Sequence, residues 1–239
     1  MPHRTFNLDE AAAYLHLDRT ELERLVSRDE IPFEKQGDRV VFRKARLDAW
    51  GSQRILGLSG SKLESYHRKS SVASRSLTAQ GALIPALLTV ERIDAALPSR
   101  TKPSVLRATV ALADRTGLVS DPAELLAALE QREELCSTAL PGGFALLHPR
   151  QHEPYMFIDS FAVLGRTVQG IHAGADDGEP TDLFFLVCCQ EDRIHLHVLA
   201  RLCTMAQSTR VLQGLREAGD AAAMLAVLVA AEEEVVKHL

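Results

Sequence analysis

The run DLFFLVCC (182–189) restricts the fold of this 239-residue chain more than any other segment. Side chains alternate between the two faces of a strand, so the seven apolar residues after Asp182 would make both faces apolar. A strand of this kind has to be covered on both sides, which is typical of the centre of a sheet. Hydrophobic residues make up 46% of the chain, enough to bury a sizeable core around such a strand.

The rest of residues 82–239 alternates between strand-like and helix-like segments. Apolar runs bounded by turn residues predict strands over 92–97, 144–147, 156–164 and 182–189. Apolar residues at helical spacing predict helices over 102–118, 121–135, 192–206, 209–218 and 220–234. This alternation predicts an α/β fold, with a sheet flanked by helices.

The first 55 residues follow a different plan. The run NLDEAAAYLHL opens with Asn7, which can cap a helix, and RTELERLVSRDE predicts a second helix. Gly37-Asp38 inside FEKQGDRVVF predicts a hairpin, and RKARLDAW predicts a closing helix. Helix, turn, helix, hairpin and helix in this order predict a small winged-helix domain.

Charge divides the chain at about the same place. Residues 1–55 have no net charge, residues 56–80 carry +3 and the remainder carries −8. The stretch 56–81 is rich in Ser, Gly and Lys/Arg and lacks apolar periodicity, so a flexible basic linker is expected there. The predicted organisation is a winged helix-turn-helix domain over 1–55, the linker over 56–81 and the α/β domain over 82–239.

Composition also limits location and partners. No window of about 18 apolar residues could span a membrane, and the N-terminus has no apolar signal core. The cysteines (Cys136, Cys188, Cys189 and Cys203) have no C-x-x-C spacing, so they are expected to be reduced thiols. We therefore expect a cytoplasmic protein with no membrane span and no cofactor. The net charge of −5 gives no general support for nucleic-acid binding.

The run FALLHPR (144–150) ends an expected strand in His148. An imidazole at a strand end would be exposed, and because histidine titrates near neutral pH, much of it would be the neutral nucleophile. Arg132 could offset the charge of a transferring phosphoryl group. These features suggest a phosphoacceptor histidine. The expected phosphate loop offers hydroxyl and backbone N–H donors from Ser137, Thr138, Gly142 and Gly143.

A second histidine follows the central strand. EDRIHLHVLARL places His195 and His197 at a helix start, and ligand sites of such sheets form beyond the carboxyl ends of strands. His148 and His195 could therefore meet there. One alternative is a helix-capping histidine with an unrelated second one. Another is a zinc site formed by these three histidines, but no acid or thiol at ligand spacing supports it, so no metal is predicted.

Residues 1–55, called the head below, resemble the excisionase family of MerR-like helix-turn-helix domains. The resemblance rests on E-A-A-x-Y-L (10–15), R-L-V (24–26), I-P (31–32) and R-x-x-x-L-D-A-W (43–50). It implies that the second helix reads the major groove and that the wing contacts the DNA backbone. The groove-facing candidates are Arg19, Thr20, Glu23, Arg24 and Ser27, and those on or beside the wing are Arg39, Arg43 and Lys44.

Other roles for this head stay open. Glu21 and Glu23 lie on the same helix, so a head without net charge should bind duplex DNA weakly alone. The basic linker could add contacts, and a homodimer would double them. The charged residues could also form only surface pairs along the helix, or the same fold could bind a protein.

Residues 82–235 resemble the fructose/mannitol/nitrogen-type enzyme IIA of the bacterial phosphotransferase system. Four motifs in order carry the resemblance: REELCST (132–138), GGFALLH (142–148), GIHAGADDGEPTDLFFLV (170–187) and HLHVLARL (195–202). The family implies a mixed sheet flanked by helices. It also implies that His148 accepts phosphate at Nε2 from an HPr-like phosphocarrier, with His195 orienting and Arg132 holding the group. Such a domain is a phosphohistidine carrier rather than a stand-alone enzyme.

Four positions depart from the family pattern, which has glycine where this chain has Cys136, Ala139, Pro141 and Pro149. Ala139 would be unfavourable if its position needed a positive φ. Pro149 removes an N–H group that could have faced the phosphate.

Together the two resemblances predict a regulator, in which phosphorylation of His148 modulates a DNA-binding head and so transcription. Two other classes of function stay open. Residues 82–239, called the body below, could pass a phosphoryl group to a IIB domain in sugar transport. Alternatively, a catalytically degenerate body could act as a protein-binding scaffold.

Overall fold

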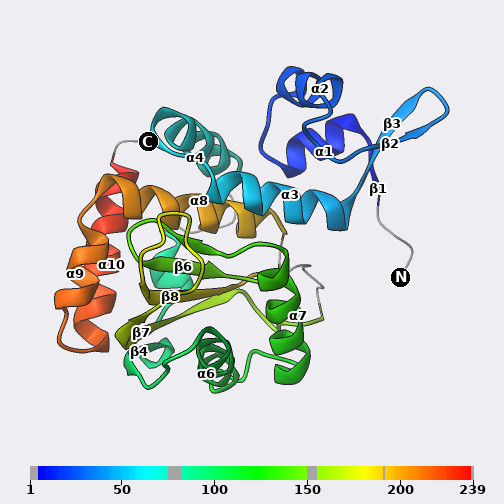
Figure 1. Ribbon diagram of the computed structural model, residues 1–239. Helices are drawn as coiled ribbons and strands as arrows, with labels where there is room; N and C mark the ends of the chain where they lie inside the picture. Colours follow the sequence, from blue (N-terminus) through cyan, green and yellow to red (C-terminus); the bar gives the residue numbers. More distant parts are fainter. Residues whose placement is uncertain (1–4, 75–81, 150–154, 191, 238–239) are drawn as a thin grey trace.

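The computed structural model describes residues 5–74, 82–149, 155–190 and 192–237, and Figure 1 shows their arrangement. The N-terminal elements are β1 (Thr5–Phe6), α1 (Leu8–Tyr14), α2 (Arg19–Ser27), β2 (Glu34–Gln36), β3 (Arg39–Arg43) and α3 (Lys44–Leu56). The three strands form a small sheet in the order β1-β3-β2. The predicted order of helix, helix, hairpin and helix is confirmed.

Short-range features of the sequence explain where α1 begins and where the hairpin turns. The Asn7 side chain accepts a hydrogen bond from the Glu10 backbone N–H at 2.9 Å, and the Glu10 carboxylate accepts one from Asn7 at 2.8 Å. This reciprocal pair caps α1. Gly37 has a φ of +62° at the hairpin tip between β2 and β3, a backbone conformation that favours glycine.

The body is a mixed sheet with helices on both faces. Its strands are β4 (Ile93–Leu97), β5 (Ala139–Leu140), β6 (Phe144–Leu147), β7 (Phe161–Ile171) and β8 (Thr181–Cys188), in the order β4-β7-β8-β6-β5. Its helices are α4 (Gly60–Ser74), α5 (Ile84–Leu87), α6 (Lys102–Asp114), α7 (Pro122–Leu135), α8 (Asp192–Ser208), α9 (Val211–Glu217) and α10 (Ala221–Val236), with a 3-10 turn at Val90–Arg92. β8 is parallel to β6 and antiparallel to β7. The predicted α/β class and mixed sheet are confirmed.

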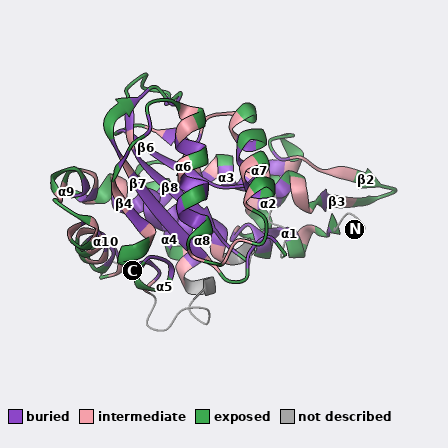
Figure 2. Cartoon of the chain, turned by 90° about the horizontal axis from the view of Figure 1, so that it is seen from below, coloured by how far each residue is buried: buried purple, intermediate pink, exposed green. Residues whose placement is uncertain are grey.

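β8 occupies the centre of the sheet, and its two faces enter two different cores. Leu183, Phe185, Val187 and Cys189 pack on the side of α8 and α10, whereas Phe184, Leu186 and Cys188 pack on the side of α6 and α7. None of these seven side chains is more than 3% exposed. Figure 2 shows the same pattern as buried strands between partly exposed helices. The alternation predicted from DLFFLVCC is therefore present in the structure.

Two predicted elements have different bounds. The strand expected over 156–164 is instead β7 over 161–171, because Ser160 donates its backbone N–H to the Asp159 carboxylate and the chain turns there. Phe157, before this turn, forms an isolated bridge with Val119. The helix expected to reach residue 118 ends at Asp114, and the Thr116 hydroxyl then bonds to the chain on either side.

The structure also differs from the flexible linker expected over 56–81. Residues 60–74 form helix α4, which lies against α8 and buries Leu63 and Tyr66. The sequence lacks a continuous apolar stripe here because part of the buried face is polar and includes His67 and Ser70. Residues 75–81 lie outside the described part of the chain, and the predicted domain boundaries remain predictions.

A buried polar network joins α4 to α8 and α10. Arg201 on α8 donates one hydrogen bond to His67 Nε2 and another to the Glu232 carboxylate, both at 2.6 Å. Glu232 also accepts from two backbone N–H groups at the start of α5. The Ser70 hydroxyl lies 2.9 Å from His197 Nδ1, and the rings of His67 and His197 stack 5.8 Å apart. Every buried charge in this network thus has a partner, as its burial requires.

This network predicts a pH-dependent stability. Burial, together with the charge of Arg201, lowers the pKa of His67 to about 3 and that of His197 to about 2. In the unfolded chain both histidines titrate at about pH 6.5, so below that pH the unfolded state binds more protons than the folded state. The free energy of unfolding should therefore fall on acidification from about pH 6.5 towards about pH 3, by up to about 1.4 kcal/mol per pH unit for each histidine.

Chemical denaturation at several pH values between about 7 and about 5 measures this slope. His67→Gln keeps an acceptor for Arg201 but removes one titrating group, so the slope should decrease. His172→Gln, on the exposed turn after β7, serves as the control and should keep the wild-type slope. An unchanged slope in His67→Gln would contradict the assignment.

Candidate functional site

His148 follows β6 directly and points its ring at its own strand. Its Nδ1 lies 2.8 Å from the Leu146 carbonyl oxygen. A carbonyl oxygen can only accept, so this contact places the proton of the neutral ring on Nδ1 and leaves the lone pair on Nε2. The ring is 2% exposed, which contradicts the exposed imidazole expected from a strand end.

Arg132 reaches this lone pair from the last turn of α7. Its Nε donates to His148 Nε2 at 3.1 Å, and its Nη1 donates to the Cys136 carbonyl oxygen at 2.9 Å. Its Nη2 is buried and has no hydrogen-bond partner among the described residues. A buried guanidinium N–H without an acceptor is unfavourable. An anionic oxygen placed here would therefore gain a charge-assisted hydrogen bond.

His195 completes the group from the N-terminal part of α8. Its ring centroid lies 5.1 Å from that of His148, with the two planes tilted by 53°. The structure thus brings His148, His195 and Arg132 together, as expected from the sequence. His197 lies instead in the α4 network. In the described part of the chain, no three His, Cys, Asp or Glu side chains gather into a group that could hold a metal ion.

A residue that the sequence did not suggest also belongs to this group. Ser52 on α3 places its hydroxyl 3.2 Å from His195 Nε2, and its side chain is buried. The motifs that define the helix-turn-helix resemblance end at residue 50 and give Ser52 no role. Only the packing of α3 against α8 brings it here.

Ser137 and Thr138 precede β5 and use their hydroxyl groups within the protein. Thr138 is fully buried, and both its hydroxyl and its backbone N–H donate to Glu133. Glu133 is in turn paired with Lys102 at 2.6 Å. The Ser137 hydroxyl donates to the Ala173 carbonyl oxygen at 2.8 Å. These two residues shape the segment beside His148 rather than presenting their hydroxyl hydrogens to a ligand.

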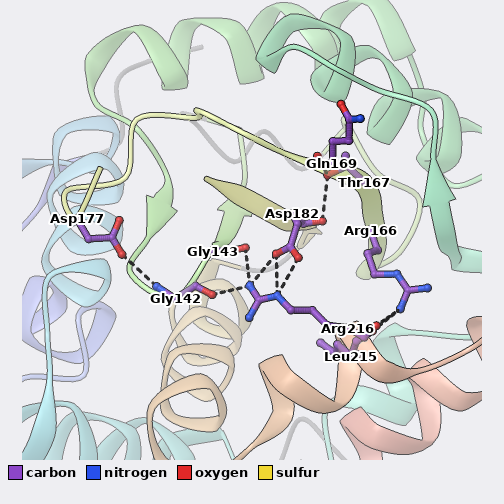
Figure 3. A network of polar contacts seen from close by, with 9 residues as sticks. All are labelled: Gly142, Gly143, Arg166, Thr167, Gln169, Asp177, Asp182, Leu215 and Arg216. Atoms are coloured by element: carbon purple, nitrogen blue, oxygen red, sulfur yellow. Dashed lines mark hydrogen bonds and ion pairs between the residues drawn. The ribbon is translucent and has the colours of Figure 1, made fainter. Parts of the chain in front are cut away.

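Gly142 and Gly143 lie at the other end of β6 from His148. His148 comes five positions after Gly143, which in a strand corresponds to about 16 Å. Figure 3 shows what holds the glycine turn instead: Arg216 donates to the Gly142 carbonyl oxygen at 2.6 Å and pairs with Asp182. The structure therefore does not bring these two glycines to His148, contrary to the expected phosphate loop.

Two departures from the family pattern can now be placed. Ala139 is in β5, paired with Ala145 in an extended ladder, so its position needs no positive φ. Alanine is therefore compatible with this backbone. Pro149 is buried directly after His148 and has no N–H group to offer.

Four of the eight DNA-binding candidates are held in ion pairs within the head: Arg19, Glu23, Arg43 and Lys44. Arg19 pairs with Asp9 and, at 2.9 Å, with Glu23. The other pairs are Arg43 with Glu34 at 2.6 Å and Lys44 with Asp48 at 3.1 Å. Such pairs agree with the alternative of a surface stabilised by its own charges.

The other four candidates are exposed and take part in no ion pair with a described residue. Thr20, Arg24 and Ser27 lie on α2, and Arg39 lies at the start of β3. Arg24 and Arg39 form no ion pair with any described residue. These two guanidinium groups are therefore the ones most readily offered to phosphates or base edges.

Comparison with known proteins identifies both parts of the chain. A family model described as "Phosphoenolpyruvate-dependent sugar phosphotransferase system, EIIA 2" matches residues 86–231, more than half of the chain. The chain belongs to this EIIA 2 family. A second model, described as "Helix-turn-helix domain", matches residues 5–55.

Curated relatives of the EIIA part come from two kinds of protein. The chain is 27% identical over 147 residues to the PTS system fructose-specific EIIABC component of Bacillus subtilis (strain 168), a match over 61% of this chain and 23% of the relative. It is 33% identical over 102 residues to the nitrogen regulatory protein of Bradyrhizobium diazoefficiens, over 42% of this chain and 65% of the relative. The matches thus span less than two thirds of either relative.

Solved structures support the same fold. The nitrogen regulatory protein IIA-Ntr from Neisseria meningitidis superposes with a TM-score of 0.56 at 25% identity, covering 62% of this chain and 99% of that one. IIA mannitol from Escherichia coli gives 0.53 at 20% identity, covering 59% and 98%. No helix in the described residues is both long and apolar enough to cross a membrane.

Gly143 lies where neighbouring atoms approach the backbone closely. A Cβ on Gly143 would lie 2.6 Å from Arg216 Nη2 and 3.0 Å from the Pro180 carbonyl oxygen, and φ there is +79°. Gly143→Ala should therefore lower the free energy of unfolding by about 2–3 kcal/mol, from backbone strain plus the displacement of the arginine and the Pro180 carbonyl. Gly178→Ala is the matched control, since its φ is +73° with nothing within 4 Å, and should lose only about 1 kcal/mol. Equal losses in a denaturant titration would contradict the close approach of Arg216.

Proposed function

We propose that this chain is a regulatory phosphocarrier. It accepts a phosphoryl group on Nε2 of His148 from an HPr-like phosphocarrier, and its head binds DNA, so that phosphotransferase state affects transcription. The observation that carries the proposal is the double contact of the His148 ring. Leu146 and Arg132 agree in assigning the proton to Nδ1 and the lone pair to Nε2.

The transfer step follows from this tautomer. The His148 Nε2 lone pair attacks phosphorus, a new P–N bond forms, and the P–N bond to the carrier's histidine breaks with its electron pair returning to that ring. The proton on Nδ1 stays in its hydrogen bond to Leu146, so the phosphorylated ring is cationic and its charge faces a carbonyl dipole. Arg132 has to turn its Nε away from Nε2 to admit phosphorus. Its unpartnered Nη2 is then close by to bind a phosphoryl oxygen.

A regulatory role is favoured over simple transport because a helix-turn-helix domain shares the chain. One curated relative is a nitrogen regulatory protein, although another is a fructose transport component. Passing the phosphoryl group to a IIB domain is therefore the second candidate function. Transfer from the phosphorylated chain to a purified fructose-type IIB domain would favour it.

Phosphotransfer can be tested with phosphoenolpyruvate, enzyme I and an HPr-like carrier. Wild type should become labelled on His148, and His148→Ala should remain unlabelled. Arg132→Gln should be labelled about a hundredfold more slowly, since one donor to the transferring group is lost. His172→Ala, on an exposed turn, is the histidine control and should be labelled as wild type is. Undiminished label on His148→Ala would rule out this acceptor.

DNA binding by the head can be tested through its salt dependence. Retention of a random-sequence duplex by the full chain should weaken as salt rises, because phosphate contacts release counterions. Arg24→Ala and Arg39→Ala should each reduce the slope of log affinity against log salt by about 0.9. Arg107→Ala, an exposed arginine on α6, is the charge-matched control and should leave the slope unchanged. Salt-insensitive or absent retention would instead favour a protein-binding head.

A further inference from the structure

A helix of the head contacts His195 in the candidate phosphorylation site. Ser52 belongs to the part matched by the helix-turn-helix model, and His195 belongs to the part matched by the EIIA 2 model. Their contact at 3.2 Å is thus a contact between the two family units. Figure 1 shows α3 lying between α1 and α2 on one side and the body on the other.

Small residues let α3 approach α8 this closely. A Cβ on Gly51 would lie 3.0 Å from Leu15 in α1's C-terminal turn and 3.5 Å from Leu196 on α8. Gly51 and Ser52 are both buried. A continuous apolar core runs from the head through α8 to the sheet, so α3 packs here over a genuine interface.

The site that includes this contact is closed to a phosphocarrier. His148 and His195 are each 2% exposed. A carrier has to bring its phosphohistidine in line with Nε2 at close contact, which a buried ring does not permit. A phosphoryl group would also add roughly two negative charges to a buried place. Arg132 could offset only part of that charge, and leaving the rest buried next to the contact of α3 with His195 would be strongly unfavourable.

We infer that the head and the phosphocarrier compete for one surface, and that the docked head and phosphorylated His148 exclude each other. This inference rests on the proposed phosphorylation of His148 and adds how that event reaches the head. The interaction surface is the start of α8 with His195 at its centre, and its occupant in the unphosphorylated chain is α3. Phosphorylation displaces α3, while the carrier gains access only when α3 is undocked.

The rest of the fold defines what moves. α4 stays on the body, because Arg201 and Glu232 hold it through His67. Between α3 and α4 lie three residues, 57–59, followed by Gly60 with a φ of +53°. The head would turn about this short segment. Lys69 on α4 pairs with Asp18 at the start of α2 and, at 3.8 Å, with Glu21. Both pairs would break as the head leaves, and surface pairs of this kind contribute little.

Labelling rates of three full-length chains test the competition. Ser52→Trp should wedge α3 off α8, so His148 should be labelled by the phosphorylated carrier at least about tenfold faster than in wild type. Gln53→Trp changes the exposed neighbour on the same helix and should be labelled at the wild-type rate. Equal rates in all three chains, with label on His148, would overturn the competition and leave the proposed function standing. No label in any chain would overturn the proposed function and the inference together.

Thiol accessibility tests the same point with a smaller change. Ser52→Cys should react with a maleimide at least about tenfold more slowly than Gln53→Cys, as read by mass spectrometry of the peptide that contains the substituted residue. After phosphorylation it should react at least about tenfold faster, and adding His148→Ala should abolish that increase. The inference would be overturned if Ser52→Cys reacted as fast as Gln53→Cys before phosphorylation. It would also be overturned if the reaction rate of Ser52→Cys did not change after full phosphorylation.

Discussion

Strand β8 has to be covered on both faces. The positions of His148, His195 and Arg132 follow from how the chain meets that requirement. α8 comes directly after β8 and returns over one face, so it begins where the parallel strand β6 ends. His148 follows β6 and His195 lies near the start of α8, which brings their rings to 5.1 Å. α7 lies on the other side, and its last turn delivers Arg132 to the same edge. α8, which is far from α7 and β6 in sequence, thus meets both of them because one strand is apolar on both sides.

α8 is itself an interior helix, since the sheet lies on one side and α3 and α4 lie on the other. Its buried polar residues therefore need partners from the chain that covers it. Ser52 faces His195, Ser70 faces His197, and His67 with Glu232 holds Arg201. The helix that carries His195 in this way also supports the N-terminal part. A change of charge at its start would act directly on the contact with α3.

The helix-turn-helix part contains two kinds of arginine. Arg19 and Arg43 are engaged by carboxylates within the head, whereas Arg24 and Arg39 are not engaged by any described residue. Affinity for a duplex depends largely on neutralising phosphates. A head without net charge therefore has few cations to offer to a duplex. Its affinity would depend more on whether α3 is docked on α8 than on its own charge.

The sequence by itself determined the class of both parts. Alternating apolar residues in DLFFLVCC, the cap residue Asn7, and ordered motifs around His148 and His195 are local signals that survive in the fold. Only the tertiary structure decided which donors surround His148. Gly142 and Gly143 are adjacent to the strand in sequence, but the length of β6 carries them to its opposite end. Ser52 lies far from His195 in sequence, and helix packing brings the two together at 3.2 Å. The same packing turned an expected linker into α4, because a helix with a partly polar face is stable only when another helix supplies partners for its buried polar groups.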